Sequence, residues 1–471
     1  MNQATRKIRT ALGQTVAFVL VLSSCAWARV FVGWSSSQLP PPSALGLSDV
    51  VFSWKTGIAP WIASARKQGY RVYIQAPAEQ AKAAAEEGKK SGCVGIIVNV
   101  PEPENEQLAS SIADLRSAYP KLRFLVLNAN GKQPVMRGSI IIKRDSVLEV
   151  SSPTAQPWID ANLALIRVEE RARRPEIPLY SFTWVDQQQQ RTLTAVDYLL
   201  AVAEAAAYHA DLVLPIDEHL QESLATHDAA AWELWNEVRS MMRFSTGSAG
   251  LEPVANVAVV DDHLDISDEV LNLLARHNIP FKVFLPEDVK ATNLKAFDIL
   301  IVSAKPDQDM AEQIKNFATR GATVVLVDSH GSYPWQGGQR VQVNEQATSY
   351  AVGNGTVLEL SEPVVDPETF AQDIGRLLGK KKAVLSLWNG LTTLAVSYQD
   401  RSGRVKMLEL VNYAAEPVRV QVRVKGSFTS VRYETPDHGC CQSLTPVKHD
   451  GFTEFTIPDL TIAGRVHLES Q

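Results

Sequence analysis

The sequence predicts an α/β protein that ends in an all-β region: a (β/α)8 TIM-like barrel, a flavodoxin-like α/β domain and a small antiparallel β-sandwich. Three observations support this prediction. Short apolar runs alternate with amphipathic helical stretches from residue 29 to about residue 245. The same alternation returns over residues 254–335, and from residue 383 the pattern changes to strict apolar–polar alternation. The predicted domains are 29–245, 246–379 and 380–471, after an N-terminal segment 1–28.

The first region carries enough strand–helix units for a compact barrel, which typically needs about 250 residues. Helical spacing of apolar residues fills most of the intervals, although the intervals 33–50 and 127–139 are too short for a full helix. We therefore expect a trimmed or partly irregular barrel. Its eight predicted strands are residues 30–33, 50–53, 72–75, 94–100, 123–127, 139–142, 179–183 and 212–215.

In the second region, apolar runs bounded by Gly, Pro and Asp predict strands buried on both faces, as in a parallel sheet covered by helices. The runs are residues 257–260, 281–285, 298–303 and 323–328, with helices at 267–277 and 310–319. Residues 254–335 contain no Cys and no GxGxxG, so a nucleophilic Cys and a dinucleotide fingerprint are both absent. The main interpretation is a structural module. A minor alternative is a ligand sensor built from Asp261, His263 and His330.

In the third region, five alternating segments predict antiparallel strands, and Gly403, Gly426 and Gly451 mark turns between them. Alternation of this kind suits sheets with one buried face, as in a sandwich. The segments are residues 392–398, 405–412, 418–424, 430–433 and 452–457.

Residues 254–335, the glycine-bounded strand at 353–360 and the helical segment 366–379 together resemble the class I glutamine-amidotransferase-like domain of multidomain glycoside hydrolases, such as the family 42 β-galactosidases. The segment 408–413 resembles part of their C-terminal β-domain. The order of barrel, middle domain and β-domain also agrees. The resemblance implies a catalytic barrel, a middle domain without catalysis that helps to hold subunits together, and hence a homo-oligomer.

The N-terminal segment has the pattern of a secretory signal. Arg6, Lys7 and Arg9 precede an apolar core at 16–22, and residues 26–28 form an A-x-A cleavage site. Residues 22–25 also fit a lipoprotein box, which would leave a lipid on Cys25. Because the apolar core is too short to span a bilayer, we expect an exported periplasmic or extracellular protein with no membrane span. Its formal charge of −6 argues against a nucleic-acid partner.

The cysteines give no metal signal. CxxC and HExxH are both absent, so neither a metal nor another cofactor is predicted. Cys440 and Cys441 are adjacent, and two alternatives stay open for them: a vicinal disulfide or two unpaired thiols.

Barrel chemistry takes place at the carboxyl ends of the strands. Three tryptophans follow predicted strands there: Trp34, Trp54 and Trp184. Indole rings can stack on the C–H faces of sugars, while fixed polar groups bind the hydroxyls, although the same tryptophans could instead plug the barrel as core. The predicted carbohydrate-binding set is Trp34, Trp54, Lys55, Gln75, Asn99, Asn128, Asn130 and Trp184.

Glycoside hydrolysis usually needs two carboxylates on either side of one bond. We predict Glu102 as the general acid, Asp186 as the base or nucleophile, and Asp217 as the alternative partner. The resemblance implies a Glu directly after an Asn at strand four and a Glu at strand seven, and the chain departs from both. Each acid also has a structural interpretation: Glu102 could be a solvated loop residue, and Asp186 and Asp217 could begin helices, where acidic residues are common. The other carboxylates at strand ends are Glu104, Asp145 and Glu218.

Two functions follow. The first is hydrolysis of an oligo- or polysaccharide in the barrel mouth. The alternative is a catalytically inactive carbohydrate-binding or envelope-assembly protein with the same architecture, which the two departures favour.

Overall fold

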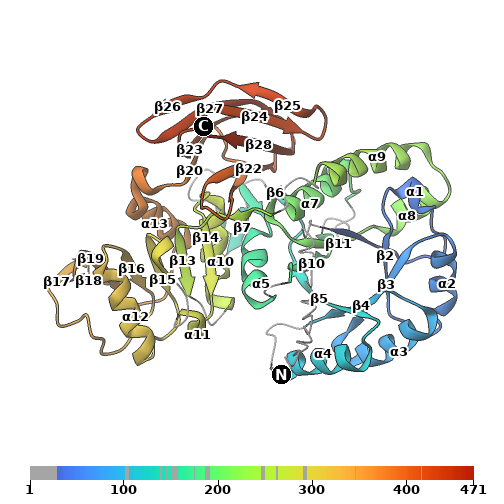
Figure 1. The fold of residues 1–471 in the computed structure, drawn as a ribbon, viewed down its shortest axis with the longest axis horizontal. Coiled ribbons are helices and arrows are strands. Elements are labelled where there is room, and N and C mark those ends of the chain that lie inside the picture. Colours follow the sequence, from blue (N-terminus) through green and yellow to red (C-terminus); the bar gives the residue numbers. More distant parts are fainter. Residues whose placement is uncertain are drawn as a thin grey trace, which may run out of the picture.

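The computed structural model describes residues 29–470, apart from 101–105, 138–140, 145–146, 151–156, 174–175, 186–190, 246–249, 261–263, 290–293, 345 and 415. Three sheet systems follow one another along the chain (Figure 1). We call them the barrel, the middle sheet and the sandwich. In Figure 1 the barrel lies to the right, the middle sheet to the left and the sandwich above both.

The barrel is closed and parallel. Its strands lie in the ring order β1-β2-β3-β4-β5-β10-β11, and β11 pairs with β1 to close it. The strands are β1 (Val30–Gly33), β2 (Asp49–Ser53), β3 (Arg71–Pro77), β4 (Gly95–Asn99), β5 (Arg123–Gly131), β10 (Leu179–Phe182) and β11 (Asp211–Pro215). These seven correspond to seven of the eight predicted barrel strands.

The prediction of a barrel strand at 139–142 is wrong. In the described part of this segment, β7 (Ile141–Arg144) pairs antiparallel with β8 (Val147–Val150) in a separate hairpin. β10 instead pairs directly with β5, with Leu179 opposite Leu127. The reason is the length of the connection, because a parallel neighbour requires a crossover of a dozen or more residues. A second small sheet pairs β6 (Val135–Arg137) with β9 (Trp158–Asp160).

One apolar side chain from each strand fills the barrel interior, as expected for side chains that alternate in and out of a small barrel. These seven buried residues form a cluster of their own: Phe31, Val51, Tyr73, Ile97, Leu127, Leu179 and Val213. We call this cluster the interior layer.

Helices surround the barrel, and one of them is covered on several sides. α7 (Ala195–Tyr208) is buried along nearly its whole length from Asp197 onward. It contacts β11 and α9 (Ala229–Phe244), and also β22 (Val405–Asn412) of the sandwich. This explains why α7 is apolar all round rather than amphipathic. The other barrel helices are α1 (Pro42–Leu45), α2 (Ala59–Lys67), α3 (Ala81–Ser91), α4 (Glu106–Ala118), α5 (Leu163–Arg173) and α8 (Glu218–Ala225).

The middle sheet contains the four predicted strands and the glycine-bounded strand in parallel, in the order 2-1-3-4-5 along the chain. Two antiparallel strands, which were not predicted, extend it. The strands across the sheet are β14 (Phe281–Phe284), β13 (Val257–Val260), β15 (Ile299–Val302), β16 (Thr323–Leu326), β19 (Gly355–Leu360), β18 (Ala347–Val352) and β17 (Arg340–Asn344). Its helices are α10 (Leu264–Arg276), α11 (Pro286–Val289), α12 (Gln308–Thr319) and α13 (Pro367–Lys382).

The sensor alternative for the middle sheet gains no support from the described residues. Asp261 and His263 lie outside them. His330 is exposed, and its Nε2 lies 3.2 Å from Asp328 Oδ1. The resemblance of this region to an amidotransferase-like domain, like the three domain boundaries, stays a prediction.

Two antiparallel sheets form the sandwich, and one apolar cluster fills the space between them. The larger sheet runs β12 (Glu252–Pro253), β21 (Thr393–Gln399), β22 (Val405–Asn412), β28 (Ala463–Glu469), β24 (Ser430–Thr435) and β25 (Gly439–Leu444). The smaller runs β20 (Leu385–Trp388), β23 (Val418–Lys425), β27 (Phe452–Leu460) and β26 (Val447–His449). Cys440 and Cys441 are bonded to each other, and Cys93 is a buried free thiol.

Buried polar contacts join the sandwich to the barrel. The Tyr398 hydroxyl donates to the carbonyl of Ala207 at 2.5 Å, and Arg465 Nη2 donates to the carbonyl of Phe244 at 3.1 Å. Among the described helices, none combines the length and the apolar character that crossing a bilayer requires.

Candidate functional site

A polar layer lies directly above the interior layer at the carboxyl end of the barrel. Counting two residues along each strand, which returns to the same face, gives Gly33, Ser53, Gln75, Asn99, Ala129, Ser181 and Pro215. None of these side chains is large and apolar. The barrel is therefore packed in its lower part and hollow at its mouth.

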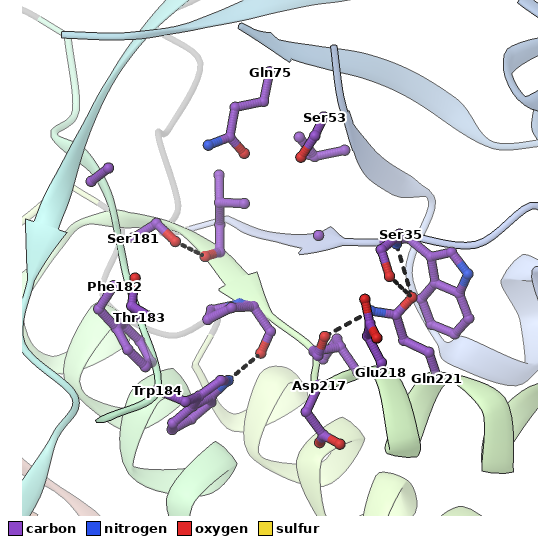
Figure 2. Close-up of a pocket in the computed structure, with 17 residues that line it drawn as sticks. Ser35, Ser53, Gln75, Ser181, Phe182, Thr183, Trp184, Asp217, Glu218 and Gln221 are labelled. Carbon is purple, nitrogen blue, oxygen red and sulfur yellow. Dashed lines mark hydrogen bonds between the residues drawn. The ribbon is translucent and has the colours of Figure 1, made fainter. Parts of the chain in front are cut away.

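The hollow is a cavity of about 450 Å³ (Figure 2). Its floor includes Ser53, Gln75 and Ser181, and Thr183 and Glu218 line it further out. The Ser181 hydroxyl donates to the carbonyl of Val213 at 2.8 Å. Polar groups at the closed end of a concave site are the usual means of fixing a small polar ligand.

Trp34 and Trp184 line this cavity mainly as packed walls. Each of these two residues is 3% exposed. Trp34 Nε1 donates to the carbonyl of Gln38 at 3.1 Å, and Trp184 Nε1 donates to the carbonyl of Pro215 at 2.9 Å. Trp184 also makes edge contacts with the rings of Phe182 and Tyr198. Both tryptophans thus shape the barrel mouth and offer a ligand little ring surface.

Five of the predicted binding residues are not among those that line the cavity. Trp54 is partly buried against the core, and the Nζ of exposed Lys55 lies 3.3 Å from the centroid of the Trp61 ring. Asn128 is fully buried, donates to Glu169 Oε1 at 2.9 Å and accepts from the exposed Asn130. Asn99 belongs to the polar layer, and its Oδ1 is buried without a hydrogen-bond partner among the described residues.

Two adjacent carboxylates line the described part of the cavity, and they differ in their surroundings. Asp217 caps α8, because its Oδ1 accepts from the backbone N–H of Leu220 at 3.0 Å. Its Oδ2 accepts from the Tyr198 hydroxyl. Burial, reinforced by this bond to Asp217, raises the pKa of Tyr198 far above its usual range, so the phenol stays a donor. Both carboxylate oxygens of Asp217 therefore already accept hydrogen bonds that stabilise the fold.

Glu218 is exposed and makes no hydrogen bond or ion pair within the described residues. Figure 2 shows it beside Gln221 on the rim, while the Asp217 carboxylate points away from the other labelled side chains. Both polar atoms of the Gln221 side chain are hydrogen-bonded within the protein, because Oε1 accepts from the Ser35 backbone N–H at 2.8 Å and Nε2 donates to the carbonyl of Ile216 at 2.7 Å. Glu218 is thus the accessible carboxylate of this part of the mouth.

The predicted acid and base, Glu102 and Asp186, lie outside the described residues. Of the predicted set, the cavity brings together Trp34, Gln75, Trp184 and Asp217. Sequence reasoning did not select Ser53, Ser181 or Thr183, and it ranked Asp217 above Glu218. The two-residue period above the interior layer could have identified the serines, because it marks which positions face the barrel axis.

No family model matches the chain, and no curated protein matches it. Among solved structures, α-L-fucosidase isoenzyme 2 from Paenibacillus thiaminolyticus is similar to it with a TM-score of 0.59 and 11% sequence identity, over 94% of this chain and 100% of the fucosidase chain. The β-galactosidase from Rahnella sp. R3 gives a TM-score of 0.51 and 11% identity, over 95% of this chain and 99% of its own. The protein therefore has the fold of barrel glycoside hydrolases.

Proposed function

We propose that the protein is an exported glycoside hydrolase-like protein that acts on an oligo- or polysaccharide in the barrel mouth by paired-carboxylate hydrolysis. The observation that carries this proposal is the polar cavity at the carboxyl end of the barrel, with an accessible carboxylate on its rim. The fold shared with two glycoside hydrolases supports it, because active sites in such barrels lie at this end.

Glu218 supplies one carboxylate of the proposed pair. The second is Glu102 or Asp186, which follow strands β4 and β10 in the sequence. One member protonates the glycosidic oxygen as the bond breaks, and the other either attacks the anomeric carbon or activates water. A separation of about 5 Å between the two carboxyl groups would give retention of configuration, and a wider one inversion.

The lining of the cavity supplies the binding groups. Ser53, Gln75 and Thr183 offer hydroxyl and amide groups that match the hydroxyls of a sugar ring. The apolar sides of Trp34 and Trp184 limit the cavity laterally. With about 450 Å³, it suits a short terminal portion of a glycan rather than a long internal stretch.

The N-terminal pattern of Arg6, Lys7, Arg9 and the A-x-A site supports export to an oxidising compartment. The bonded pair Cys440–Cys441 agrees with such a compartment. We also propose, from the resemblance described above, that copies of the chain associate through the middle sheet. Light scattering on the mature chain tests this.

The test is a hydrolysis screen with aryl glycosides and natural polysaccharides, run on the chain from Arg29 and on three variants: Glu218→Gln, Glu102→Gln and Asp186→Asn. We expect Glu218→Gln and one of the other two to lower kcat at least about 100-fold, as for loss of an acid–base group. Glu222→Gln is the matched control, because Glu222 is an exposed residue of the same helix α8 and does not line the cavity.

Glycan binding without turnover by the unmodified chain would replace this function with the alternative, a carbohydrate-binding protein of the same architecture. Turnover that survives in Glu218→Gln would remove Glu218 from the proposed pair.

A further inference from the structure

A group of metal-ligand side chains lies in the sandwich, far along the chain from the barrel mouth. Glu434 on β24, Cys440 and Cys441 on β25 and His467 on β28 each place one ligand atom within 4.8 Å of the others. β24 pairs with both β25 and β28, so the three strands are neighbours in one sheet. The sequence search for CxxC and HExxH could not find this group, because its members come from three strands.

Glu434 is the centre of the group. Its Oε1 lies 3.1 Å from His467 Nε2 and accepts from Arg465 Nη1 at 2.9 Å. Its Oε2 faces Cys441, whose Sγ lies 4.0 Å away. Arg465 is also paired with Glu409 at 2.7 Å and is nearly fully buried. The positive charge of Arg465 is thus also neutralised by the Glu409 carboxylate, which leaves Glu434 able to share an oxygen with a cation.

Two thiolates, an imidazole and a carboxylate are ligand types that Zn²⁺ takes in proteins. In the structure the two sulfurs are bonded to each other, and a disulfide sulfur does not serve as a thiolate ligand. Exchange with an external dithiol changes this. The dithiol is oxidised to its own disulfide, and Cys440 and Cys441 each gain one electron and one proton, so that two thiols replace the bond.

We propose that Glu434, Cys440, Cys441 and His467 form a redox-controlled binding site for a thiophilic divalent cation such as Zn²⁺. The site is closed while Cys440 and Cys441 are joined, and it opens when a dithiol reduces them. Metal binding then releases the two thiol protons, because the thiolate is the ligand.

Access agrees with this proposal. Cys440 is exposed, and Cys441 and His467 are partly exposed, so a reductant and an ion both reach the group from solvent. The site does not depend on the proposed hydrolysis, since none of its residues lines the barrel cavity.

The test uses Co²⁺ as the probe on the full chain, reduced with a phosphine that is then removed without air. We expect the reduced chain to develop the near-ultraviolet thiolate-to-cobalt absorption, and Zn²⁺ to displace it. The oxidised chain should show none. Cys441→Ser should remove the absorption, and His467→Gln should weaken Co²⁺ binding at least about tenfold.

Two variants serve as controls. Cys93→Ser removes the buried free thiol, and His449→Gln removes an exposed histidine on β26 of the other sheet. Both should bind Co²⁺ as the unmodified chain does. No cobalt absorption on the reduced chain would overturn the site. Binding that is undiminished in His467→Gln would overturn the four-residue assignment and leave only a dithiol. A melting curve for each variant separates loss of ligand from loss of fold.

Discussion

The Tyr413 hydroxyl, at the end of sandwich strand β22, donates a hydrogen bond to the buried carboxylate of Glu204 on barrel helix α7. The same hydroxyl lies 2.8 Å from the hydroxyl of Tyr208. Asn162 donates twice to Glu204, from its backbone at 3.1 Å and from Nδ2 at 2.7 Å. Barrel and sandwich are therefore joined through an ionisable group that water does not reach. Burial raises the pKa of Glu204 to about 7, from an ordinary 4.5.

Glu204 makes the free energy of unfolding depend on pH. Between pH 4.5 and 7 the folded protein holds a proton that the unfolded chain has released, so stability falls as pH rises through this window. We expect Glu204→Gln to remove up to about 3 kcal/mol of this fall. Denaturant unfolding of both proteins at several values from pH 4.5 to 8 measures it. Glu222→Gln, on exposed α8 surface, should follow the unmodified chain, and a pH-independent difference between the Glu204 variant and the unmodified chain would contradict the prediction.

His209 makes the free energy of unfolding depend on pH in the opposite direction, over a pH range that overlaps that of Glu204. Its ring stacks on Tyr398 with ring centroids 4.1 Å apart, and burial of the imidazole lowers its pKa to about 3. Between pH 3 and 6.5 the unfolded chain holds the proton, so stability falls as pH falls. His209→Asn should reduce this acid sensitivity, and Asn suits the left-handed backbone there, with φ of 60°. Denaturant unfolding at pH 4 and pH 7 measures it. Equal sensitivity in variant and parent would contradict it.

Substitutions at Asp217 and at Glu218 should have different effects, because Asp217 stabilises the fold and Glu218 is proposed to act in turnover. Asp217→Ala removes a helix cap and the acceptor of the buried Tyr198 hydroxyl, so we expect a loss of about 2–3 kcal/mol. Asp228→Ala, which removes only the cap of α9, should cost about 1 kcal/mol. Glu218→Gln should stay within about 0.5 kcal/mol of the unmodified chain. Chemical unfolding measures all three. A Glu218 variant as unstable as the Asp217 variant would show that Glu218 is structural.

Gly355 is required by close packing in the middle sheet. A Cβ at this position would lie 2.2 Å from the carbonyl oxygens of Ala318 and Ala322, both backbone atoms that cannot move aside cheaply. We expect Gly355→Ala to cost about 3 kcal/mol or more through overpacking. Gly337→Ala is the matched control, because a Cβ there meets nothing within 4 Å. Melting temperatures compare the two, and equal values would refute the packing argument.

The parts of the fold that could be predicted from the sequence are the strands that are buried on both faces. Seven barrel strands and the parallel strands of the middle sheet were predictable because strands buried on both faces are continuous apolar runs. The run at 139–142 has the same composition, but its position depends on a connection length rather than on local preference. β17 and β18 lie at the end of the sheet, and their sequences RVQVN and ATSYAV mix polar with apolar residues, so neither forms the continuous apolar run of a strand buried on both faces.

The candidate site was predictable in part. Strand ends led to Gln75, Trp34 and Trp184, because parallel strands place their carboxyl ends at one mouth. Choosing between Asp217 and Glu218 required knowing that Tyr198, on α7, reaches Asp217. Contacts between distant parts of the chain decide such a choice, and one sequence does not contain them.

Strand β12 has a consequence for the order of assembly. Glu252 and Pro253 pair with β21 of the sandwich before the chain enters the middle sheet. Where that region begins and ends, Asn256 Nδ2 donates to the carbonyl of Lys382 at 3.0 Å. The chain therefore enters the middle region from β12 of the larger sheet and returns from it to β20 of the smaller sheet, so the middle region is inserted between strands of the sandwich. During synthesis, β12 therefore leaves the ribosome long before its partner strand β21. The two can pair only after the whole inserted segment between them has been made.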